Sequence, residues 1–286
     1  MHPLKKVAIT LAGICKKGLN RFRSSVFVIR GKRPWSYGYQ AYKDDSIKRV
    51  LSDLCFHPDH LCQGHGHRLD ERIVEYPWFL SRLPQGRGVL LDAGSVLNHE
   101  FLVSHPKLSE KKLFISTLAP ESRAFWQRGI SYVYEDLRRC CFRDEYFDWI
   151  TSLSTIEHIG LDNAKLYSKD AYFAENRTSS HLDAVKEFRR ILKPGGTLYL
   201  SFPYGTHRNH GWFQVFDASM VQNVIDAFGP SRVQQQFYRY TPEGWINSNQ
   251  AECANATFFD VWEHGLNYDP DMAAASRCVA CLELSV

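Results

Sequence analysis

The sequence predicts an α/β fold in which a mostly parallel sheet carries helices on both faces. From Gly88 onward, short apolar runs alternate with stretches of helical periodicity, which is the order that parallel sheets require. The first run, Val89–Leu91, leads into Asp92 and Gly94, an acid and a glycine at the point where open sheets bind ligands. With 286 residues, of which 44% are hydrophobic, the chain is long enough to bury a full core.

The expected elements follow from apolar periodicity and from the residues that begin and end helices. Strands are expected at Val89–Leu91, Lys112–Leu118, Ile130–Tyr134, Phe147–Leu153, Thr197–Pro203, Val233–Tyr240 and Cys278–Leu284. Helices are expected from Leu69 to the residue before Pro77, from Ala119 onward, over His181–Leu192 and over Phe216–Phe228. The glycines of Lys193-Pro194-Gly195-Gly196 end the third of these helices.

The chain is expected to divide into a basic N-terminal extension, residues 1–68, and a domain at 69–286. Lys5 to Lys48 is rich in Lys and Arg, with almost no acids before Asp44. Such a segment favours binding to an anionic membrane surface, a nucleotide-linked sugar or nucleic acid. The same composition is also typical of a solvated extension, a partner-binding segment or a lid. Its apolar part, Val7–Ala12, is expected to form an amphipathic helix on a membrane or on the domain.

Several classes of protein are disfavoured by the composition. No run approaches the roughly 18 apolar residues that cross a bilayer, and a convincing signal peptide is absent, so a cytoplasmic protein is expected, with contact at the inner membrane face left open. The eight cysteines are irregularly spaced, as in a reduced protein. Cys278 and Cys281 are expected to pack in a strand, and the histidines between His57 and His67 to form a loop rather than a zinc site.

Four phrases in this order resemble the class I S-adenosylmethionine-dependent methyltransferases. They are Leu-Leu-Asp-Ala-Gly at 90–94, Glu-Asp-Leu at 135–137, Phe-Asp-Trp-Ile-Thr-Ser at 147–152 and Phe-Arg-Arg-Ile-Leu-Lys-Pro-Gly-Gly-Thr-Leu at 188–198. The resemblance covers Gly88 to Pro203, and the Ile-Glu-His phrase at 156–158 is similar to the branch of small-molecule O-methyltransferases. It implies a Rossmann-like fold with a seven-stranded, mostly parallel sheet.

The resemblance also implies which residues hold S-adenosylmethionine. Asp92 would orient the methionine end, Asp136 would accept from the adenine amino group, and Leu137 would pack on the ring. The full expected set is Asp92, Ala93, Gly94, Ser95, Asn98, Thr117, Leu118, Asp136, Leu137, Leu153 and Ser154. Val96 and Asn98 stand where the family has glycines, and Thr117 stands where it has the ribose-binding acid. Either Glu121 compensates, or the affinity for the cofactor is reduced, or activity is lost.

Methyl transfer to a hydroxyl needs a base, and His158 is the expected one because its ordinary pKa lies near neutrality. Glu157 would orient it or bind substrate, and His158 fits a structural cap of the loop equally well. His207, Arg208 and His210 are the reserve candidates for the base and for an anion clamp. Substrate residues are expected at Tyr76, Trp78, Tyr204, Arg208, His210 and Trp212, with Thr241–Asp271 forming a loop over the site. Tyr76 and Trp78 fit the core equally well. A divalent metal held by Glu157 and His158 with His207 or His210 is conceivable but not expected.

The sequence thus predicts O-methylation of a sugar, a glycan or another hydroxylated small molecule. The alternative is a catalytically inactive domain of the same fold that binds a ligand or partner, which the altered glycines and Thr117 favour. A nicotinamide-dependent dehydrogenase would need a glycine triad that is absent, and no RNA-binding motif accompanies the basic N-terminal segment.

Overall fold

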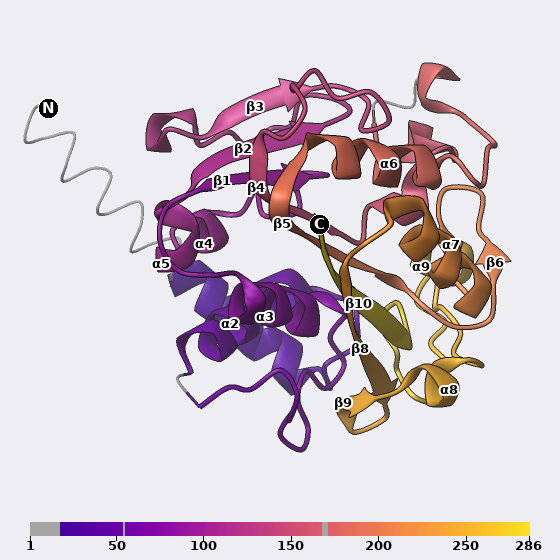
Figure 1. The fold of residues 1–286 in the computed structure, drawn as a ribbon. Coiled ribbons are helices and arrows are strands. Elements are labelled where there is room, and N and C mark those ends of the chain that lie inside the picture. The colour runs from indigo at the N-terminus through magenta and orange to yellow at the C-terminus, as the bar shows by residue number, and fades with distance from the viewer. Residues whose placement is uncertain (1–17, 54, 168–170) are drawn as a thin grey trace, which may run out of the picture.

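The computed structural model describes residues 18–53, 55–167 and 171–286, and it is built around one twisted sheet (Figure 1). The eight strands of this sheet are β1 (Val89–Ala93), β2 (Lys112–Thr117), β3 (Ser131–Tyr134), β4 (Phe147–Leu153), β5 (Leu192–Pro203), β8 (Arg232–Thr241), β9 (Gly244–Ser248) and β10 (Cys278–Ser285). Their order is β3-β2-β1-β4-β5-β10-β8-β9. The seven expected strands are all present, and β9, which pairs with β8 as a hairpin, is the eighth.

The first five strands are parallel to one another, and β10 runs antiparallel between β5 and β8. β1 lies between β2 and β4, so the strand order reverses at the carboxyl end of β1. Helical connections leave this point toward opposite faces, which opens a crevice there. The sheet therefore places its ligand-binding crevice at the turn that follows Asp92.

Helices cover both faces of the sheet, as expected (Figure 1). The helical residues 18–29, α2 (Tyr39–Ser52) and α3 (Arg72–Arg82) share one hydrophobic core with Leu90 and Tyr199. α6 (His181–Ile191) and α7 (Ala218–Phe228) share the other core with Leu91 and Leu198. Neighbouring strand residues belong to different cores because successive side chains of a strand point to opposite faces.

The remaining elements are short. They are α4 (Glu100–Val103), α5 (Pro106–Ser109), α8 (Gln250–Cys253), α9 (Val261–His264), the 3₁₀ turns η1 (Trp126–Arg128), η2 (Ile156–His158), η3 (Asn163–Lys165) and η4 (Ala171–Phe173), and a small hairpin of β6 (Arg208–Asn209) with β7 (Gln214–Val215). The helix expected from Ala119 is replaced by irregular chain and η1. The expected loop at 241–271 is instead built from β9, α8 and α9.

The prediction that the helix before β1 stops ahead of Pro77 is wrong. α3 continues through Pro77 to Arg82. Proline at this position cannot donate to the carbonyl of Ile73, and such a loss normally ends a helix. Here Nε2 of the buried His65 donates to that carbonyl across 3.2 Å. A side chain from a distant loop thus supplies the missing bond and keeps the helix intact.

The described part of the N-terminal segment packs on the sheet. Phe27, Tyr39 and Ile47 are buried in the same core as residues of α3. Lys43 and Asp70 form a buried ion pair of 2.6 Å. The expected amphipathic helix at residues 7–12 lies outside the described residues. No helix among the described residues is both long and apolar enough to cross a membrane.

Candidate functional site

A cavity of about 450 Å³ opens at the carboxyl ends of β1, β2, β3 and β4. It is lined by Gly94, Thr117, Leu118, Tyr134, Glu135, Asp136, Leu137, Arg138, Thr155, His158, Ile159, Gly160, Asn163, Tyr167, Phe173 and Glu175. Five of the residues expected to hold a cofactor, and the expected base, are in this set. The crevice predicted by the reversal of strand order is therefore a real hollow with both polar and apolar walls.

Gly94 brings the loops after β1 and β4 into contact. Its φ is +121°, a conformation that side-chain-bearing residues rarely adopt. A Cβ added there would lie 2.2 Å from Oγ1 of Thr155. Thr155 is held in turn, because its hydroxyl donates to the Leu153 carbonyl at 3.0 Å. Only glycine fits at this point of the turn.

Asp92 is fully buried beneath that turn and does not line the cavity. Its Oδ2 accepts a hydrogen bond of 2.8 Å from the backbone N–H of Leu97, and its Oδ1 has no partner within the described ranges. Burial, aided by the charge of Glu121, raises the pKa of Asp92 to about 7. The buried oxygen left open is an unsatisfied acceptor, of the kind that a cationic group nearby would stabilise.

Ser95 and Asn98 are engaged in the loop structure rather than in the cavity. The Ser95 hydroxyl donates to Oε1 of Glu121, and Nδ2 of Asn98 donates to Oε2 of Glu121 at 2.9 Å. The hydroxyl of Tyr132 donates to Oδ1 of Asn98 at 2.9 Å. Glu121 therefore joins the loop after β1 to the chain after β2. Thr117 lines the cavity, whereas Glu121 is not among its lining residues.

Asp136 stands at the cavity wall with Arg138 and Glu175. Arg138 donates to both carboxylates, with Nη2 at 2.6 Å from Oδ2 of Asp136 and 2.6 Å from Oε1 of Glu175. Burial opposes ionisation, but the hydrogen bonds and charge of Arg138 outweigh it and lower the pKa of Asp136. Asp136 is thus an anion at neutral pH. Three N–H groups of Arg138 donate to its two oxygens, so one of the four lone-pair sites is left for a further hydrogen bond.

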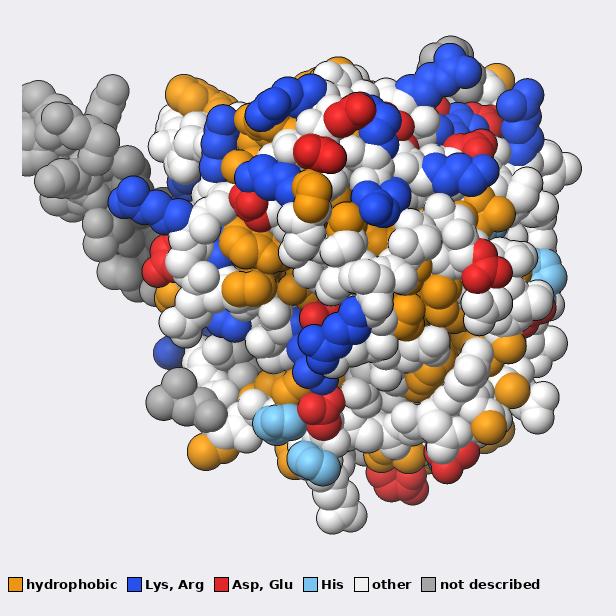
Figure 2. Space-filling model, in the orientation of Figure 1, with side chains coloured by type: hydrophobic (Ala, Val, Ile, Leu, Met, Phe, Trp, Pro, Cys, Tyr) orange, Lys and Arg blue, Asp and Glu red, His pale blue; other side chains and the backbone are white. Residues whose placement is uncertain are grey.

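A larger open groove of about 920 Å³ shares Asp136, Arg138 and Glu175 with this cavity. Its other walls carry mainly charged side chains, including Arg177, Lys186 and Arg190 of the region around α6. Figure 2 shows Lys and Arg side chains gathered where Figure 1 places β2, β3 and α6. The groove offers little apolar surface for a ring, so the smaller cavity is the better candidate site.

His158 lies in η2, directly after β4, and its ring is fixed. Nδ1 donates to the Trp212 carbonyl at 2.8 Å, and the two rings pack with their centroids 5.1 Å apart. Burial lowers the pKa of His158 to about 4, so the ring is neutral near pH 7. Since Nδ1 carries the proton, Nε2 carries the lone pair. His158 therefore presents an acceptor nitrogen on a residue that lines the cavity.

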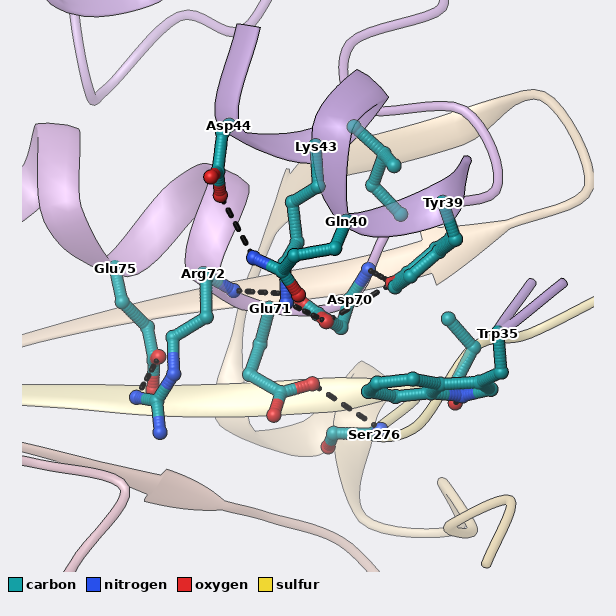
Figure 3. Close-up of polar contacts among 12 residues, drawn as sticks. Trp35, Tyr39, Gln40, Lys43, Asp44, Asp70, Glu71, Arg72, Glu75 and Ser276 are labelled. Atoms are coloured by element: carbon teal, nitrogen blue, oxygen red, sulfur yellow. Dashed lines mark hydrogen bonds and ion pairs between the residues drawn. The ribbon is translucent and has the colours of Figure 1, made fainter. Parts of the chain in front are cut away.

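Beneath the end of β4 lies a buried charge network that sequence analysis missed. Glu75 accepts from Nη1 of Arg72 at 2.7 Å, from the Ser154 hydroxyl at 2.5 Å and from the Ser201 hydroxyl at 2.7 Å. Figure 3 shows the contact between Arg72 and Glu75, together with the separate ion pair of Lys43 and Asp70. An acid within the apolar stretch Ile73-Val74-Glu75-Tyr76 was the available signal. Ser154, an expected cofactor residue, is thus bound to Glu75 of α3.

Glu157 is also buried, next to this network. Burial raises its pKa well above the usual range, and Oε2 has no partner in the described part of the chain. Leu153 and Ala93 are fully buried strand residues. The carbonyl of Leu153 accepts from Nη1 of Arg72 at 3.3 Å. None of Glu157, Leu153 and Ala93 is among the residues that line the cavity.

None of the expected substrate residues is among those that line the cavity. Trp78 and Tyr204 are buried core side chains, and Trp78 packs edge-on against Tyr199. The Tyr76 hydroxyl donates to the Val96 carbonyl at 3.1 Å. Trp212 contacts the cavity indirectly, through His158.

The two remaining expected substrate residues, Arg208 and His210, and the reserve base His207 lie around the small hairpin. Nδ1 of His207 donates to the Val215 carbonyl at 2.9 Å. Arg208 binds both carboxylate oxygens of Glu263, and His210 stacks on Phe213.

One family model and several solved structures are similar to this chain. Residues 108–200 match the family model described as a methyltransferase domain. No curated protein sequence matches this chain. Among solved structures, the chain is similar to YcgJ from Bacillus subtilis, with 13% identity and a TM-score of 0.48, over 74% of this chain and 97% of that one.

Two further structures are similar. One is the 1,6-didemethyltoxoflavin-N1-methyltransferase of Burkholderia thailandensis with bound S-adenosylhomocysteine, at 11% identity and a TM-score of 0.46, over 100% of this chain and 90% of that one. The other is phosphoethanolamine N-methyltransferase 2 of Haemonchus contortus, at 10% identity and a TM-score of 0.47, over 77% and 56% of the two chains. The segment that matches the methyltransferase-domain model runs from the residues before β2 into β5 and includes β3, β4 and α6.

Proposed function

We propose that this protein transfers a methyl group from S-adenosylmethionine to a hydroxyl of a sugar, a glycan or another hydroxylated small molecule. The observation that carries the proposal is the neutral His158, which lines the same cavity as Gly94 and Asp136 and whose Nδ1 contact leaves Nε2 as the acceptor. An acceptor hydroxyl must lose its proton as it attacks, and a fixed neutral imidazole can take that proton.

The residues of the cavity fit this cofactor. Asp136 is ionised and can accept from the adenine amino group, while Leu118 and Leu137 offer apolar surface to the ring. The open Oδ1 of Asp92 lies under the turn of Gly94, where a positively charged group would be stabilised. Bound there, the cofactor would supply a methyl group activated by the sulfonium charge. The chain then has to align the acceptor, exclude water and remove one proton.

The choice of a hydroxyl rather than an amine rests on His158 and on the residues around it. An amine acceptor is usually protonated at neutral pH and has to be deprotonated before it can attack. A hydroxyl is already neutral and passes its proton to a base only during the attack, and the neutral imidazole of His158 can accept that proton. Trp212 packs on His158 and accepts from its Nδ1, so it fixes the imidazole from outside the cavity lining.

A binding module without turnover is the second candidate. It is favoured by Thr117, a single hydroxyl where the resemblance leads us to expect an acid, and by the hold of Arg138 on Asp136. Such a domain would bind S-adenosylmethionine or its product and transfer nothing. The two candidates differ only in turnover, which one assay measures.

The assay is transfer of radiolabelled methyl from S-adenosylmethionine to a panel of sugars, nucleotide sugars, phenols and amines. We expect transfer to a hydroxyl, and a loss of roughly 100-fold or more in kcat/KM for the variant His158→Gln with unchanged affinity for S-adenosylhomocysteine. The variant His207→Gln serves as the matched control. Transfer only to amines, or loss of transfer in His207→Gln but not in His158→Gln, would contradict the proposal. Cofactor binding without any transfer would support the binding module.

A further inference from the structure

Three side chains that the methyl transfer does not use meet beside the small hairpin. His210 comes from the β6–β7 turn, Asp260 precedes α9, and Glu263 lies within it. Nδ1 of His210 is 3.5 Å from Oδ2 of Asp260 and 3.8 Å from Oε2 of Glu263. One ligand atom from each of the three lies within 4.8 Å of the others, and in the searched, described residues this is the only such group. It does not include the histidines between His57 and His67.

The imidazole of His210 is the second observation. Its side chain is 2% exposed, yet neither ring nitrogen has a hydrogen-bond partner within the described ranges. The ring is held by stacking on Phe213, with centroids 4.3 Å apart and planes 11° apart. Buried polar atoms are normally satisfied, so a fixed ring whose open Nδ1 faces two acids is short of a ligand.

We propose that His210, Asp260 and Glu263 bind a divalent transition-metal ion, with zinc as the best fit. Zinc takes imidazole nitrogen and carboxylate oxygen at about 2.0–2.2 Å, and a tetrahedral arrangement of such bonds puts ligand atoms about 3.4 Å apart. The distances from Nδ1 of His210 to the two carboxylates need only small adjustments to reach this value. Magnesium and calcium prefer oxygen ligands alone, which the imidazole does not satisfy.

The surrounding contacts orient the two carboxylates toward His210. Trp212 Nε1 donates to Oδ2 of Asp260 at 3.2 Å, and the backbone N–H of Trp262 donates to Oδ1 at 2.9 Å. Arg208 binds Oε1 and Oε2 of Glu263 at 2.7 and 2.8 Å. Hydrogen bonds to the ligating carboxylates are typical of protein metal sites. Three of the expected substrate residues, Arg208, His210 and Trp212, thereby acquire a different role.

The site is connected to the cavity through Trp212. This residue contacts Asp260 with its indole and His158 with its carbonyl. An ion that fixes Asp260 would therefore fix the residue that holds the ring of His158. Metal binding itself does not depend on the proposed function, whereas this positioning effect does.

The experiment titrates the full-length protein, stripped of metal by dialysis against a chelator, with cobalt(II) and zinc(II). We expect one cobalt ion per chain, with the visible absorption of a low-coordinate site, displaced by zinc. Binding should weaken at least tenfold in His210→Gln, in Asp260→Asn, which keeps the Oδ1 acceptor for Trp262, and in Glu263→Gln at the surface. Circular dichroism confirms folding, and Glu263→Gln carries the test if His210→Gln unfolds.

The matched control is His60→Gln, in the other histidine-containing loop, which should bind cobalt as the unaltered protein does. The proposal is overturned if no saturable binding of one ion is found. It is also overturned if His60→Gln loses binding while His210→Gln and Glu263→Gln retain it, or if only magnesium binds.

Discussion

Replacement of Gly94 by Ala tests the geometry of the site, because backbone strain and steric overlap would each lower the free energy of unfolding. The backbone at φ +121° is strained for any residue with a Cβ, at a cost of about 1–3 kcal/mol. The new methyl group would also overlap Thr155, 2.2 Å from Oγ1 and 2.4 Å from Cγ2, and overpacking of this kind costs about 1–3 kcal/mol. We therefore expect Gly94→Ala to lower the free energy of unfolding by about 4 kcal/mol.

A double-mutant cycle separates the two costs. Thr155→Gly removes the three atoms nearest to the new methyl group, and on its own it gives up the hydrogen bond to the Leu153 carbonyl, worth about 1 kcal/mol. The double variant should be more stable than the sum of the single effects by about 2 kcal/mol, and the backbone strain should remain. Urea unfolding at equilibrium measures all four proteins. The reasoning fails if the free energy of unfolding of Gly94→Ala lies within about 0.5 kcal/mol of that of the unaltered protein, which is the range of ordinary surface substitutions. It also fails if the coupling energy between the two substitutions is zero.

Two further predictions concern buried charge. The pKa of His158 is about 4 when folded and 6.5 in the unfolded chain, so below pH 6.5 the unfolded state takes up a proton that the folded state does not. The contribution of the neutral His158 to the free energy of unfolding is present above pH 6.5 and is lost as the pH falls, by about 2 kcal/mol between pH 7.5 and pH 5. Urea unfolding of His158→Gln should lack this part of the pH dependence. Glu75→Leu leaves the guanidinium of Arg72 without its carboxylate and should cost about 3–5 kcal/mol. The exposed pair of Asp183 and Lys186 gives the control, since Asp183→Ala should cost less than about 1 kcal/mol; equal effects of the two variants would contradict the burial argument.

Much of the fold could be predicted because most of its strands and helices have local sequence patterns, namely apolar runs and helical periodicity. β4 has the bounds expected from Phe147–Leu153, since a buried parallel strand is a continuous apolar run. α6 begins and ends within one residue of the expected helix. The continuation of α3 through Pro77 could not be predicted, because it depends on His65, a residue of another loop, reaching the carbonyl of Ile73.

In the candidate site, too, some residues could be predicted from local sequence and others depend on packing between distant segments. Gly94, Asp136 and His158 were found from phrases that follow strands, and parallel strands bring their carboxyl ends together whatever the loops do. Whether Trp78 covers a ligand or fills the core is decided by packing against Tyr199, which the sequence does not contain.

The group at His210 escaped prediction for a related reason. Its acids, Asp260 and Glu263, come from a stretch expected to be a loop, about fifty positions along the chain. No local spacing joins them to the histidine, so only the fold reveals the cluster.

The most direct measurement is calorimetric titration of the protein with S-adenosylhomocysteine, repeated with Asp136→Asn and with Asp226→Asn on the exposed face of α7. We expect one saturable site, unchanged in Asp226→Asn. In Asp136→Asn the site should weaken roughly 10- to 100-fold, the value of one charged hydrogen bond of about 1.5–3 kcal/mol. The absence of binding at millimolar ligand, or an affinity that does not change in Asp136→Asn, would contradict the placement of the cofactor in this cavity.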